Sequence, residues 1–398
     1  MRHRKETYTA ALFLVLLVVG LCYIGFLFLR GESTLREELG KLRRDPSYVL
    51  TFVESAETAL NEDLDHEHGF IQLYGGFQRL TGRRVLEDVN QSAQVVRLST
   101  GALNFAYLSS DPADMTGLAD SLNTFGDNLA QRDIPLLFVA APQKVEAGKD
   151  LLPPGLTDYN NPNADQFLSL LEAHGTDTVD LRPLFEETED YSSWFFRTDH
   201  HWKPEAAFYA WQSLTGILES KYGIVTDPQY TDEASYDKVV YEDYFLGSQG
   251  KRVGTLYAGT DDITEYIPKF ETNFTYTCPF YSIDRSGPFE TSLLFPERVA
   301  EKDYFNGNPY TLYAGGDYPL ATIVNHENPD GKKIVLLRES FSCALTPFLA
   351  LSCSELTTID LRYFSGNLMD TLEELDPDLV MVLYCVSSLN SPELLMFD

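Results

Sequence analysis

A carboxylate and an imidazole lie two positions apart near the middle of the chain, in the segment Arg197-Thr198-Asp199-His200-His201-Trp202. A histidine acts as a general base near neutral pH when a neighbouring carboxylate fixes its tautomer and stabilises the imidazolium ion. The segment contains no nucleophile to match this pair. The best candidate is Ser340, which follows the apolar run Ile334 to Leu337 and precedes a helix-like run of small residues. The pattern predicts nucleophilic catalysis by Ser340, His201 and Asp199.

Two other interpretations of these residues remain open. Asp199 suits a helix cap ahead of Pro204, because proline is favoured at the first helical position, and Ser340 suits a cap as well. Asp199, His200 and His201 are also metal-ligand types. Such a site needs several further Asp and His ligands, however, and the chain has only seven histidines. We therefore expect a site without a metal or other cofactor.

The composition excludes several classes of protein. With 398 residues, 44% of them hydrophobic, the chain can bury a full core. The net charge of -30 is uneven, because residues 1–44 hold eight Lys and Arg against four Asp and Glu, and the remainder holds 22 against 56. A body this acidic repels nucleic acid and other polyanions. We expect no nucleic-acid partner, and a neutral glycan fits better than an anionic polymer.

An apolar run of twenty residues, Ala10 to Leu29, lies near the N-terminus behind three basic residues. Twenty helical residues span roughly 30 Å, the hydrocarbon thickness of a bilayer. A secretory signal peptide usually has a shorter apolar core followed by a small-residue cleavage site. The charges before the run predict a single-pass transmembrane helix at 10–29 in the cell membrane, with residues 1–9 in the cytoplasm, a stem at 30–45 and an extracellular body at 46–398.

Alternating extended and helical patterns predict the fold of the body. Apolar runs of the kind found in parallel strands, which are buried on both faces, occur at Ile134 to Val139, Thr178 to Leu181, Lys333 to Leu337, Leu356 to Leu361 and Leu379 to Cys385. Helix-like spacing separates them, so we predict an α/β sheet. Ser340 follows the carboxyl end of its strand, which is the edge where such sheets bind ligands. Asp199 and His201 can reach the same edge.

Residues 224–331 interrupt this alternation. They are rich in Gly, Pro, Asp and short extended runs, and they hold 12 of the 23 tyrosines. We expect a β-rich, Tyr-rich insertion in this range. Its aromatic side chains either form a small core of their own or provide a surface on which a glycan stacks, and the sequence leaves both open.

The block Thr198-Asp199-His200-His201-Trp202, followed much later by a strand ending in Glu339-Ser340-Phe341, resembles the bacterial DHHW proteins. These proteins are similar to the SGNH-hydrolase-like proteins that O-acetylate alginate and other exopolysaccharides. The similarity covers roughly residues 70–390. The resemblance implies a doubly wound parallel sheet, Ser340 as nucleophile, and an Asp199 and His201 pair placed ahead of it in the chain. It also implies a membrane-bound O-acyltransferase partner that supplies acetyl groups.

Two features depart from the pattern of this family. Glu339 stands before Ser340 where the family leads us to expect Asp, and no Gly and Asn can be identified as the oxyanion donors of typical SGNH hydrolases. Backbone N–H groups of Ser340 and Phe341, at the start of a helix, are expected to supply part of that stabilisation.

The expected function is an O-acetyltransferase that acts on a surface polysaccharide or exopolysaccharide through an acetyl-Ser340 ester. With water as acceptor, the same site is an esterase. Lys144, Arg197 and Trp202 are candidate substrate contacts, with a salt-bridge or core role as the alternative for each. A catalytically silent module that binds glycan, or that acts as scaffold in a polysaccharide acetylation complex, is the alternative for the whole protein.

Overall fold

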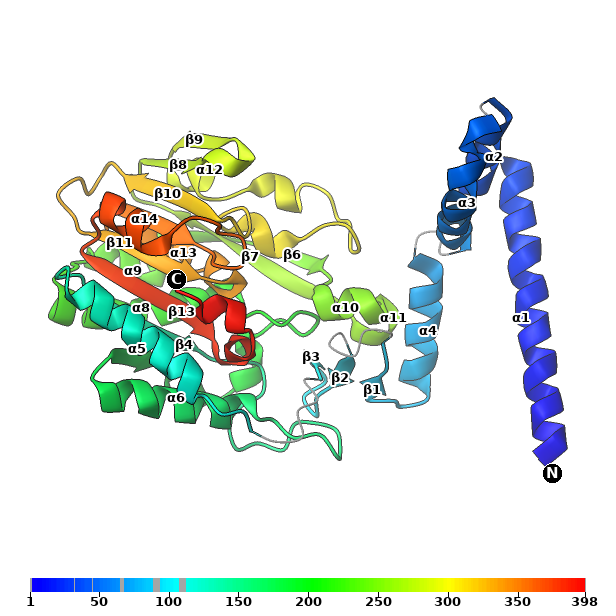
Figure 1. Cartoon of the computed structure of the whole chain (residues 1–398), viewed down its shortest axis with the longest axis horizontal. Coiled ribbons are helices and arrows are strands. Elements are labelled where there is room, and N and C mark those ends of the chain that lie inside the picture. The colour runs from blue at the N-terminus through cyan, green and yellow to red at the C-terminus, as the bar shows by residue number, and fades with distance from the viewer. Residues whose placement is uncertain are drawn as a thin grey trace. The chain divides into compact units, whose positions relative to one another are not determined.

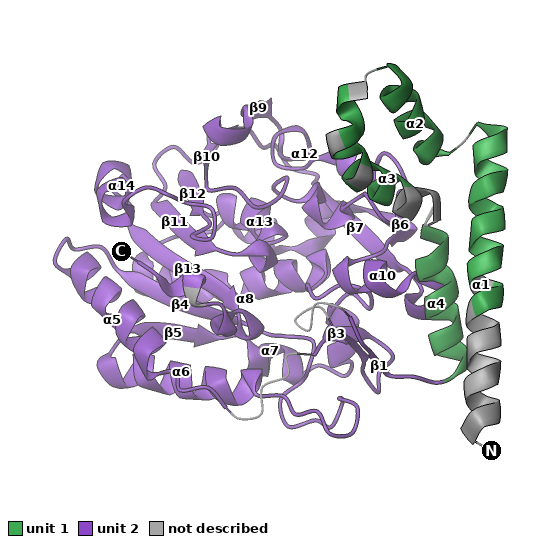
Figure 2. Ribbon diagram, turned by 45° about the vertical axis from the view of Figure 1, so that its right-hand side comes forward, with its two compact units in different colours: residues 1–81 green, residues 82–398 purple. Residues whose placement is uncertain are grey.

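The computed structural model describes residues 2–31, 33–44, 46–64, 68–88, 94–106 and 112–397. The chain divides into two compact units, Met1–Thr81 and Gly82–Asp398 (Figure 2). The first unit is helical. It contains α1 (Arg2–Arg30), α2 (Thr34–Arg44), α3 (Val49–Leu64) and α4 (Gly69–Leu80).

The predicted membrane anchor at 10–29 lies within α1. Among the described residues, no single helix is long and apolar enough to cross a bilayer, but the bent pair Leu17–Arg30 and Thr34–Arg44 meets the requirement together. The side chains of residues 10–13 and 16, at the start of the predicted anchor, lie outside the described residues. The anchor and the predicted location of the body therefore stay predictions.

The second unit is built on an eight-stranded sheet with the order β5-β4-β13-β11-β12-β10-β8-β9 (Figure 1). Five strands run parallel and correspond to the five predicted apolar runs: β4 (Leu136–Ala141), β5 (Asp177–Asp180), β11 (Lys333–Arg338), β12 (Glu355–Ile359) and β13 (Leu379–Cys385). Every residue of β4 and β13 is buried. This burial explains why their sequences are continuously apolar rather than alternating.

Helices cover both faces of the parallel strands. One face packs against α5 (Thr116–Ala130), α6 (Asn160–His174) and α14 (Leu368–Leu375). The other face packs against α8 (Pro204–Tyr222) and α13 (Thr346–Ala350). Neighbouring strand residues belong to opposite faces, as the two-residue period requires: Leu336 faces α8 and α13, and Leu337 faces the other layer. The predicted α/β architecture is confirmed.

The predicted parallel sheet is found in these five strands, but the sheet as a whole is mixed. Its remaining strands are antiparallel: β8 (Phe274–Cys278), β9 (Ile283–Gly287) and β10 (Leu320–Asn325). All three come from the predicted insertion at 224–331, and they extend the main sheet at one edge. The connection from β8 to β9 is only a short turn, which cannot make the long crossover that parallel neighbours need.

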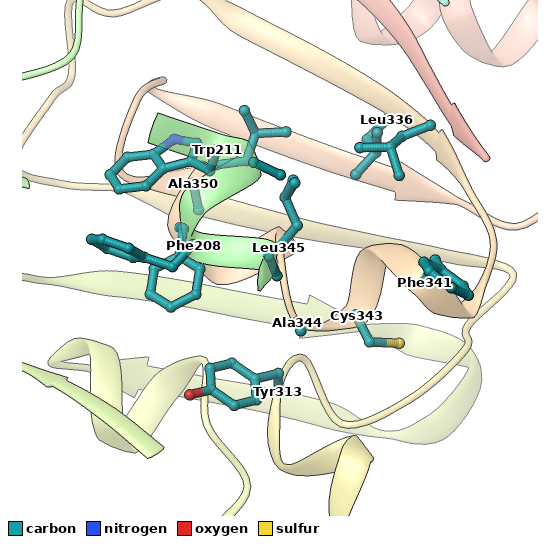
Figure 3. Packing of buried hydrophobic residues seen from close by; sticks show 14 of the residues in the cluster. Phe208, Trp211, Tyr313, Leu336, Phe341, Cys343, Ala344, Leu345 and Ala350 are labelled. Atoms are coloured by element: carbon teal, nitrogen blue, oxygen red, sulfur yellow. The ribbon is translucent and has the colours of Figure 1, made fainter. Parts of the chain in front are cut away.

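Most buried tyrosines of the insertion join the main core, and Tyr257 lies in a smaller cluster with Leu86 and Val95. Figure 3 shows Tyr313 in the same cluster as Phe208 and Trp211 of α8, and Tyr236, Tyr266 and Tyr276 belong to this main cluster too.

The described part of the second unit also contains several shorter strands and α-helices. They are β1 (Val85–Leu86), β2 (Val95–Arg97), β3 (Leu103–Phe105), β6 (Tyr236–Phe245), β7 (Asp261–Pro268), α7 (Arg182–Glu186), α9 (Pro228–Thr231), α10 (Ser248–Val253), α11 (Thr255–Ala258) and α12 (Phe289–Ser292).

Candidate active site

Ser340 lies directly beyond the carboxyl end of β11, as predicted, and begins a short 3-10 turn, Ser340–Cys343. The buried carboxylate of Glu339 holds this turn. It accepts hydrogen bonds from the N–H of Phe341 and the N–H of Cys385, both at 3.0 Å. Glu339 thereby joins the turn to the carboxyl end of β13, the neighbouring strand. The nucleophile candidate thus stands on a backbone fixed from two sides.

His201 and Asp199 reach Ser340 from the segment that leads into α8. His201 Nε2 lies 2.7 Å from Ser340 Oγ, and Nδ1 of the same ring is hydrogen-bonded to Asp199 Oδ1. The imidazole therefore lies between a hydroxyl and a carboxylate, which is the arrangement that allows a histidine to act as general base. The structure brings together the three residues that the sequence singled out, from segments about 140 positions apart in the chain.

Asp199 is buried and ionised. Burial alone would raise the pKa of this carboxyl group, but the imidazoles of His200 and His201 and the hydrogen bonds from His201 and Ser248 hold the pKa well below its ordinary value. The N–H of Ser248, the first residue of α10, donates to Asp199 Oδ2 at 2.6 Å. Both oxygens of Asp199 are therefore engaged, one with the base and one with the backbone.

Gly247 makes room for this contact. A Cβ at position 247 would lie 2.1 Å from Asp199 Cβ, so any side chain there would collide with the carboxylate. The N–H of Gly247 donates to Thr198 Oγ1 at 2.8 Å, and Thr198 Oγ1 donates to the buried Asp261 at 2.6 Å. A chain of buried polar groups therefore joins the turn before α10 to the residue that precedes Asp199.

Lys144 supports Asp199 from inside the protein. Its side chain is buried, and Nζ donates to the carbonyl of Asp199, to the carbonyl of Leu103 at 2.6 Å and to Gln249 Oε1 at 3.2 Å. Burial lowers the pKa of Lys144 to about 8, although the charges of Asp199 and Asp261 oppose the shift. The ammonium group joins three separate segments of the chain behind the site.

A pocket of about 310 Å³ opens onto Ser340 and His201. None of the three candidate substrate contacts, Lys144, Arg197 and Trp202, lines this pocket. Trp202 is fully buried, and its indole N–H donates to the carbonyl of Phe341 at 2.8 Å. Arg197 is exposed, and its backbone N–H donates to Asp261 at 2.7 Å. The structure therefore places Lys144 and Trp202 as supports of the site rather than on its surface.

Tyr310 forms one wall of the pocket. Its ring stacks on the ring of His201, with centroids 4.0 Å apart, and its hydroxyl donates to the carbonyl of Phe341 at 2.9 Å. Sequence reasoning missed this residue. The only signal was that the insertion is rich in tyrosine, which does not distinguish Tyr310 from its neighbours.

Asp317 and Arg362 also line the pocket. Asp317 is paired with Arg362 at 3.1 Å and with the buried Arg338 at 3.2 Å. Burial would raise the pKa of Asp317, but Arg338 and Arg362 hold it below its ordinary value. The carboxylate of Asp317 is thus already paired with two positively charged side chains of the protein. Sequence reasoning assigned neither residue to the site.

His200 also faces the pocket. Its Nδ1 is hydrogen-bonded to Ser248 Oγ at 3.0 Å, and burial together with the neighbouring His201 lowers its pKa. Ligand atoms of Asp199, His200 and His201 lie within 4.8 Å of one another, which is close enough for a metal ion. An ion bound to Nδ1 of His201 would displace the bond between this nitrogen and Asp199. The expectation of a site without a metal stays a prediction.

Of the two expected oxyanion donors, the backbone N–H groups of Ser340 and Phe341, only one lacks a partner within the described residues. The N–H of Phe341 already donates to Glu339 Oε2, so the expectation that Phe341 stabilises the oxyanion was wrong. Glu339 reaches this N–H because it caps the 3-10 turn. The N–H of Ser340 has no hydrogen-bond partner in the described part of the chain and remains open to a ligand.

Comparison with known proteins shows what this chain is similar to. Residues 104–238 match the family model described as SGNH hydrolase-like domain, acetyltransferase AlgX. The match includes Asp199 and His201 and ends before Ser340. The alginate biosynthesis protein AlgX of Pseudomonas aeruginosa is 26% identical over 156 residues, which are 38% of this chain and 32% of the relative. The similarity thus spans about a third of that protein.

Two solved structures share the fold. A DHHW family protein from Eubacterium siraeum is 20% identical with a TM-score of 0.60, over 78% of this chain and 97% of that one. PatB1 of Bacillus cereus is 20% identical with a TM-score of 0.63, over 79% of this chain and 99% of that one. The resemblance to DHHW proteins and to SGNH-hydrolase-like acetyltransferases, expected from the sequence, is confirmed.

Proposed function

We propose that this protein is a membrane-anchored extracellular O-acetyltransferase or esterase that acts on a cell-surface polysaccharide or exopolysaccharide through an acyl-serine. The observation that carries the proposal is the placement of His201 between Ser340 and Asp199, with Nε2 2.7 Å from the hydroxyl oxygen. The match of residues 104–238 to an acetyltransferase domain supports it. The relative from Pseudomonas aeruginosa is by name an alginate biosynthesis protein, which supports a polysaccharide as acceptor.

In the first half-reaction, His201 Nε2 takes the proton of Ser340 Oγ while the oxygen attacks the carbonyl carbon of an acetyl donor. Asp199 stabilises the imidazolium ion that forms and holds its tautomer. The N–H of Ser340 is the open backbone donor for the developing oxyanion. Collapse of the tetrahedral intermediate breaks the bond to the donor oxygen, which takes the proton from His201. The product is acetyl-Ser340.

In the second half-reaction, a sugar hydroxyl enters the pocket and His201 takes its proton. The hydroxyl oxygen attacks the acetyl carbonyl carbon, the ester bond to Ser340 Oγ breaks, and His201 returns the proton to Ser340. Water in place of the sugar gives acetate instead. The two outcomes differ only in how well the acceptor excludes water from the pocket.

The proposed location follows from the apolar run at 10–29 with its basic residues on the N-terminal side. A membrane-bound O-acyltransferase would then deliver acetyl groups to the outer face, where the body meets the polysaccharide. Protease added to intact cells should digest the body. Complete protection of the body from that protease would contradict this location.

The function is tested with the full chain in detergent micelles and p-nitrophenyl acetate as donor. We expect release of nitrophenol and an acetyl group on the peptide that contains Ser340, detected by mass spectrometry. Adding the polysaccharide of the producing cells should move acetyl groups onto the glycan if transfer dominates, and should leave free acetate if hydrolysis does. A native protein that neither releases nitrophenol nor carries acetyl on Ser340 would refute the proposed chemistry.

The alternative is a catalytically silent glycan-binding or scaffold protein of an acetylation complex. One observation favours it: Glu339 occupies the N–H of Phe341, which removes a candidate oxyanion donor. Oxyanion stabilisation is often the largest electrostatic contribution to acyl transfer. A protein that binds the polysaccharide and shows no acetyl-Ser340 would fit this alternative.

A further inference from the structure

In the described part of the second unit, the strongly exposed aromatic side chains gather at one edge of the sheet. Among the aromatic residues described between 82 and 397, three are more than half exposed: Phe280 at 65%, Tyr281 at 57% and Tyr363 at 53%. Singly scattered exposed aromatic residues need no explanation, but a group that shares one place does. The sheet topology shows that Phe280, Tyr281 and Tyr363 lie at the same edge of the sheet.

Tyr363 follows the strand beside the one that carries Ser340. Ile359, the last residue of β12, pairs with Leu337 of the parallel strand β11, so the two strands end at the same edge. The N–H of Tyr363 donates to the carbonyl of Asp360 at 3.0 Å, which keeps Tyr363 at that edge. Tyr363 and Ser340 therefore stand on neighbouring strand ends.

Phe280 and Tyr281 stand at the same edge, two strands further on. β10 is antiparallel to β12 and begins where β12 ends, because Leu320 pairs with Ile359. β8 is antiparallel to β10 in turn and ends at this edge with Cys278. Three strand spacings separate β11 from β8, which is about 14 Å at the usual spacing of about 4.8 Å.

The exposed aromatic residues are continuous with the pocket. Arg362 lines the pocket, and its guanidinium lies 5.3 Å from the ring centroid of Tyr363. Asp317 also lines the pocket, and the ring of the next residue, Tyr318, is 5.1 Å from the ring of Tyr281. Tyr318 is itself buried, so it connects Tyr281 to the pocket lining without offering a surface of its own. The exposed side chains of Tyr363, Tyr281 and Phe280 thus form an aromatic row that leads away from the site along the sheet edge.

We propose that this aromatic row is an acceptor subsite that holds a polysaccharide chain while one of its hydroxyl groups reaches Ser340. The inference rests on the proposed function and deepens it. A sugar ring has an apolar face of C–H groups and a polar rim, so it stacks on an exposed aromatic face, and a tyrosine hydroxyl can bond to the rim. The row spans the two strand spacings from β12 to β8, about 10 Å, and so accommodates more than one linked sugar.

Charge and size point to a glycan as the occupant. The body outside residues 1–44 carries 56 Asp and Glu against 22 Lys and Arg, so a neutral chain approaches without the repulsion that an anionic polymer meets. A stable protein interface needs a contiguous area on the order of 1,000 Å², which a single row of side chains does not provide.

The test measures binding in the Ser340→Ala protein, full length in detergent micelles, so that the readout does not depend on catalysis. The probes are neutral fragments of graded length, from one sugar upward, prepared from the surface polysaccharide of the producing cells. We expect affinity to rise with fragment length. Tyr281→Ala and Tyr363→Ala should each weaken binding of the long fragments by about tenfold and leave binding of the single sugar unchanged.

The control is Leu256→Ala on α11, which removes a side chain that is 59% exposed and lies outside the row. It should bind every fragment as the parent does. In the Ser340-containing protein, Leu256→Ala should also hydrolyse p-nitrophenyl acetate at the native rate. Affinity independent of fragment length, or native binding of the long fragments by both tyrosine variants, would each overturn the subsite. Failure of the proposed chemistry appears separately, as absence of acetyl-Ser340 in the native protein.

Discussion

The two halves of the candidate site are positioned in different ways. Ser340 stands at the end of a parallel strand, and the backbone pairing of Arg338 with Leu383 fixes the chain just before it. Asp199 and His201 stand on a segment without regular strands or helices, closed by a single bridge between Phe195 and Trp202. A continuous strand ladder supports the first half up to Arg338, whereas buried side chains and isolated backbone bonds support the second.

This difference has an energetic consequence. Losing one bond of a strand ladder leaves the neighbouring bonds in place. Lys144, Thr198 and Asp261, in contrast, are buried polar groups whose partners have no water to replace them. The Asp199 half should therefore be sensitive to single changes far from the reacting atoms, and the Ser340 half should be sensitive mainly at Ser340 itself.

Removing the side chain of Ser340 or of His201 should give the largest loss of turnover. The loss should be similar for the two residues, so turnover alone does not distinguish the strand half from the loop half of the site. Ser340→Ala and His201→Ala should each lower turnover of p-nitrophenyl acetate on the order of 10⁴-fold, and the double variant should be little worse, because the residues act as a unit. Stability should separate them. His201→Ala leaves the buried Asp199 without its partner and should cost about 1–3 kcal/mol in urea unfolding, which Ser340→Ala should not. Appreciable turnover by either single variant would contradict the assignment.

Gly247→Ala should be the next most severe change, although residue 247 reacts with nothing. The added methyl group would lie 2.1 Å from Asp199 Cβ, so Asp199 must move, and a displacement of about 1 Å can cost about 100-fold in rate. The matched control is Gly216→Ala within α8, where the new Cβ meets no atom within 4 Å. That control should keep full activity and gain about 0.5–1 kcal/mol of stability. Equal activity of both variants would show that Asp199 is not held by this contact.

Lys144→Met should lower turnover by roughly tenfold to 100-fold, because the carbonyl of Asp199 loses its charged donor. In the native protein the ammonium must be charged to act, so activity should fall as pH rises through about 8, the pKa to which burial lowers it. Asp199 and Asp261 are the charged groups that face it. The variant should lack this alkaline decline. Identical pH profiles for the two proteins would remove Lys144 from the positioning of the site.

The stability contribution of Lys144 should change in the opposite direction. Its pKa is lower in the folded state, at about 8, than its ordinary value of 10.5. The unfolded chain therefore binds more protons between these values, and the free energy of unfolding contributed by this residue rises with pH across the window. The difference in urea unfolding between native protein and Lys144→Met, measured at pH 7 and pH 10, should show this rise. A difference that is constant with pH would contradict the lowered pKa.

The sequence predicted the strand half of the site better than the loop half, for a physical reason. Parallel strands buried on both faces appear as continuous apolar runs, so β11 and the position of Ser340 at its end could be recognised. The pairing of Asp199 with His201 is local and could be recognised too. Tyr310 and Asp317 could not be placed, because they reach the site only through tertiary contacts.

The antiparallel edge of the sheet was missed for a related reason. β8 and β10 alternate between buried and half-buried residues, and they lie in a segment rich in turn residues. Alternation of this kind identifies a strand but not its neighbour, so the sequence did not show that the insertion joins the main sheet. The aromatic row depends on the same pairing and became visible only with the strand order.

Glu339→Asp should give the smallest effect and tests the strand half. The resemblance to the DHHW proteins led us to expect Asp at this position. An aspartate can still cap the N–H of Phe341. Its side chain is one methylene shorter, so it should no longer span from Phe341 to the N–H of Cys385, which Glu339 now joins. The buried N–H left unpaired should cost about 1–3 kcal/mol in urea unfolding. Turnover should change by no more than a few fold, because the ladder of β11 still holds Ser340 in place. A loss of activity as large as that of Gly247→Ala would mean that the strand half depends on single side chains as much as the loop half does.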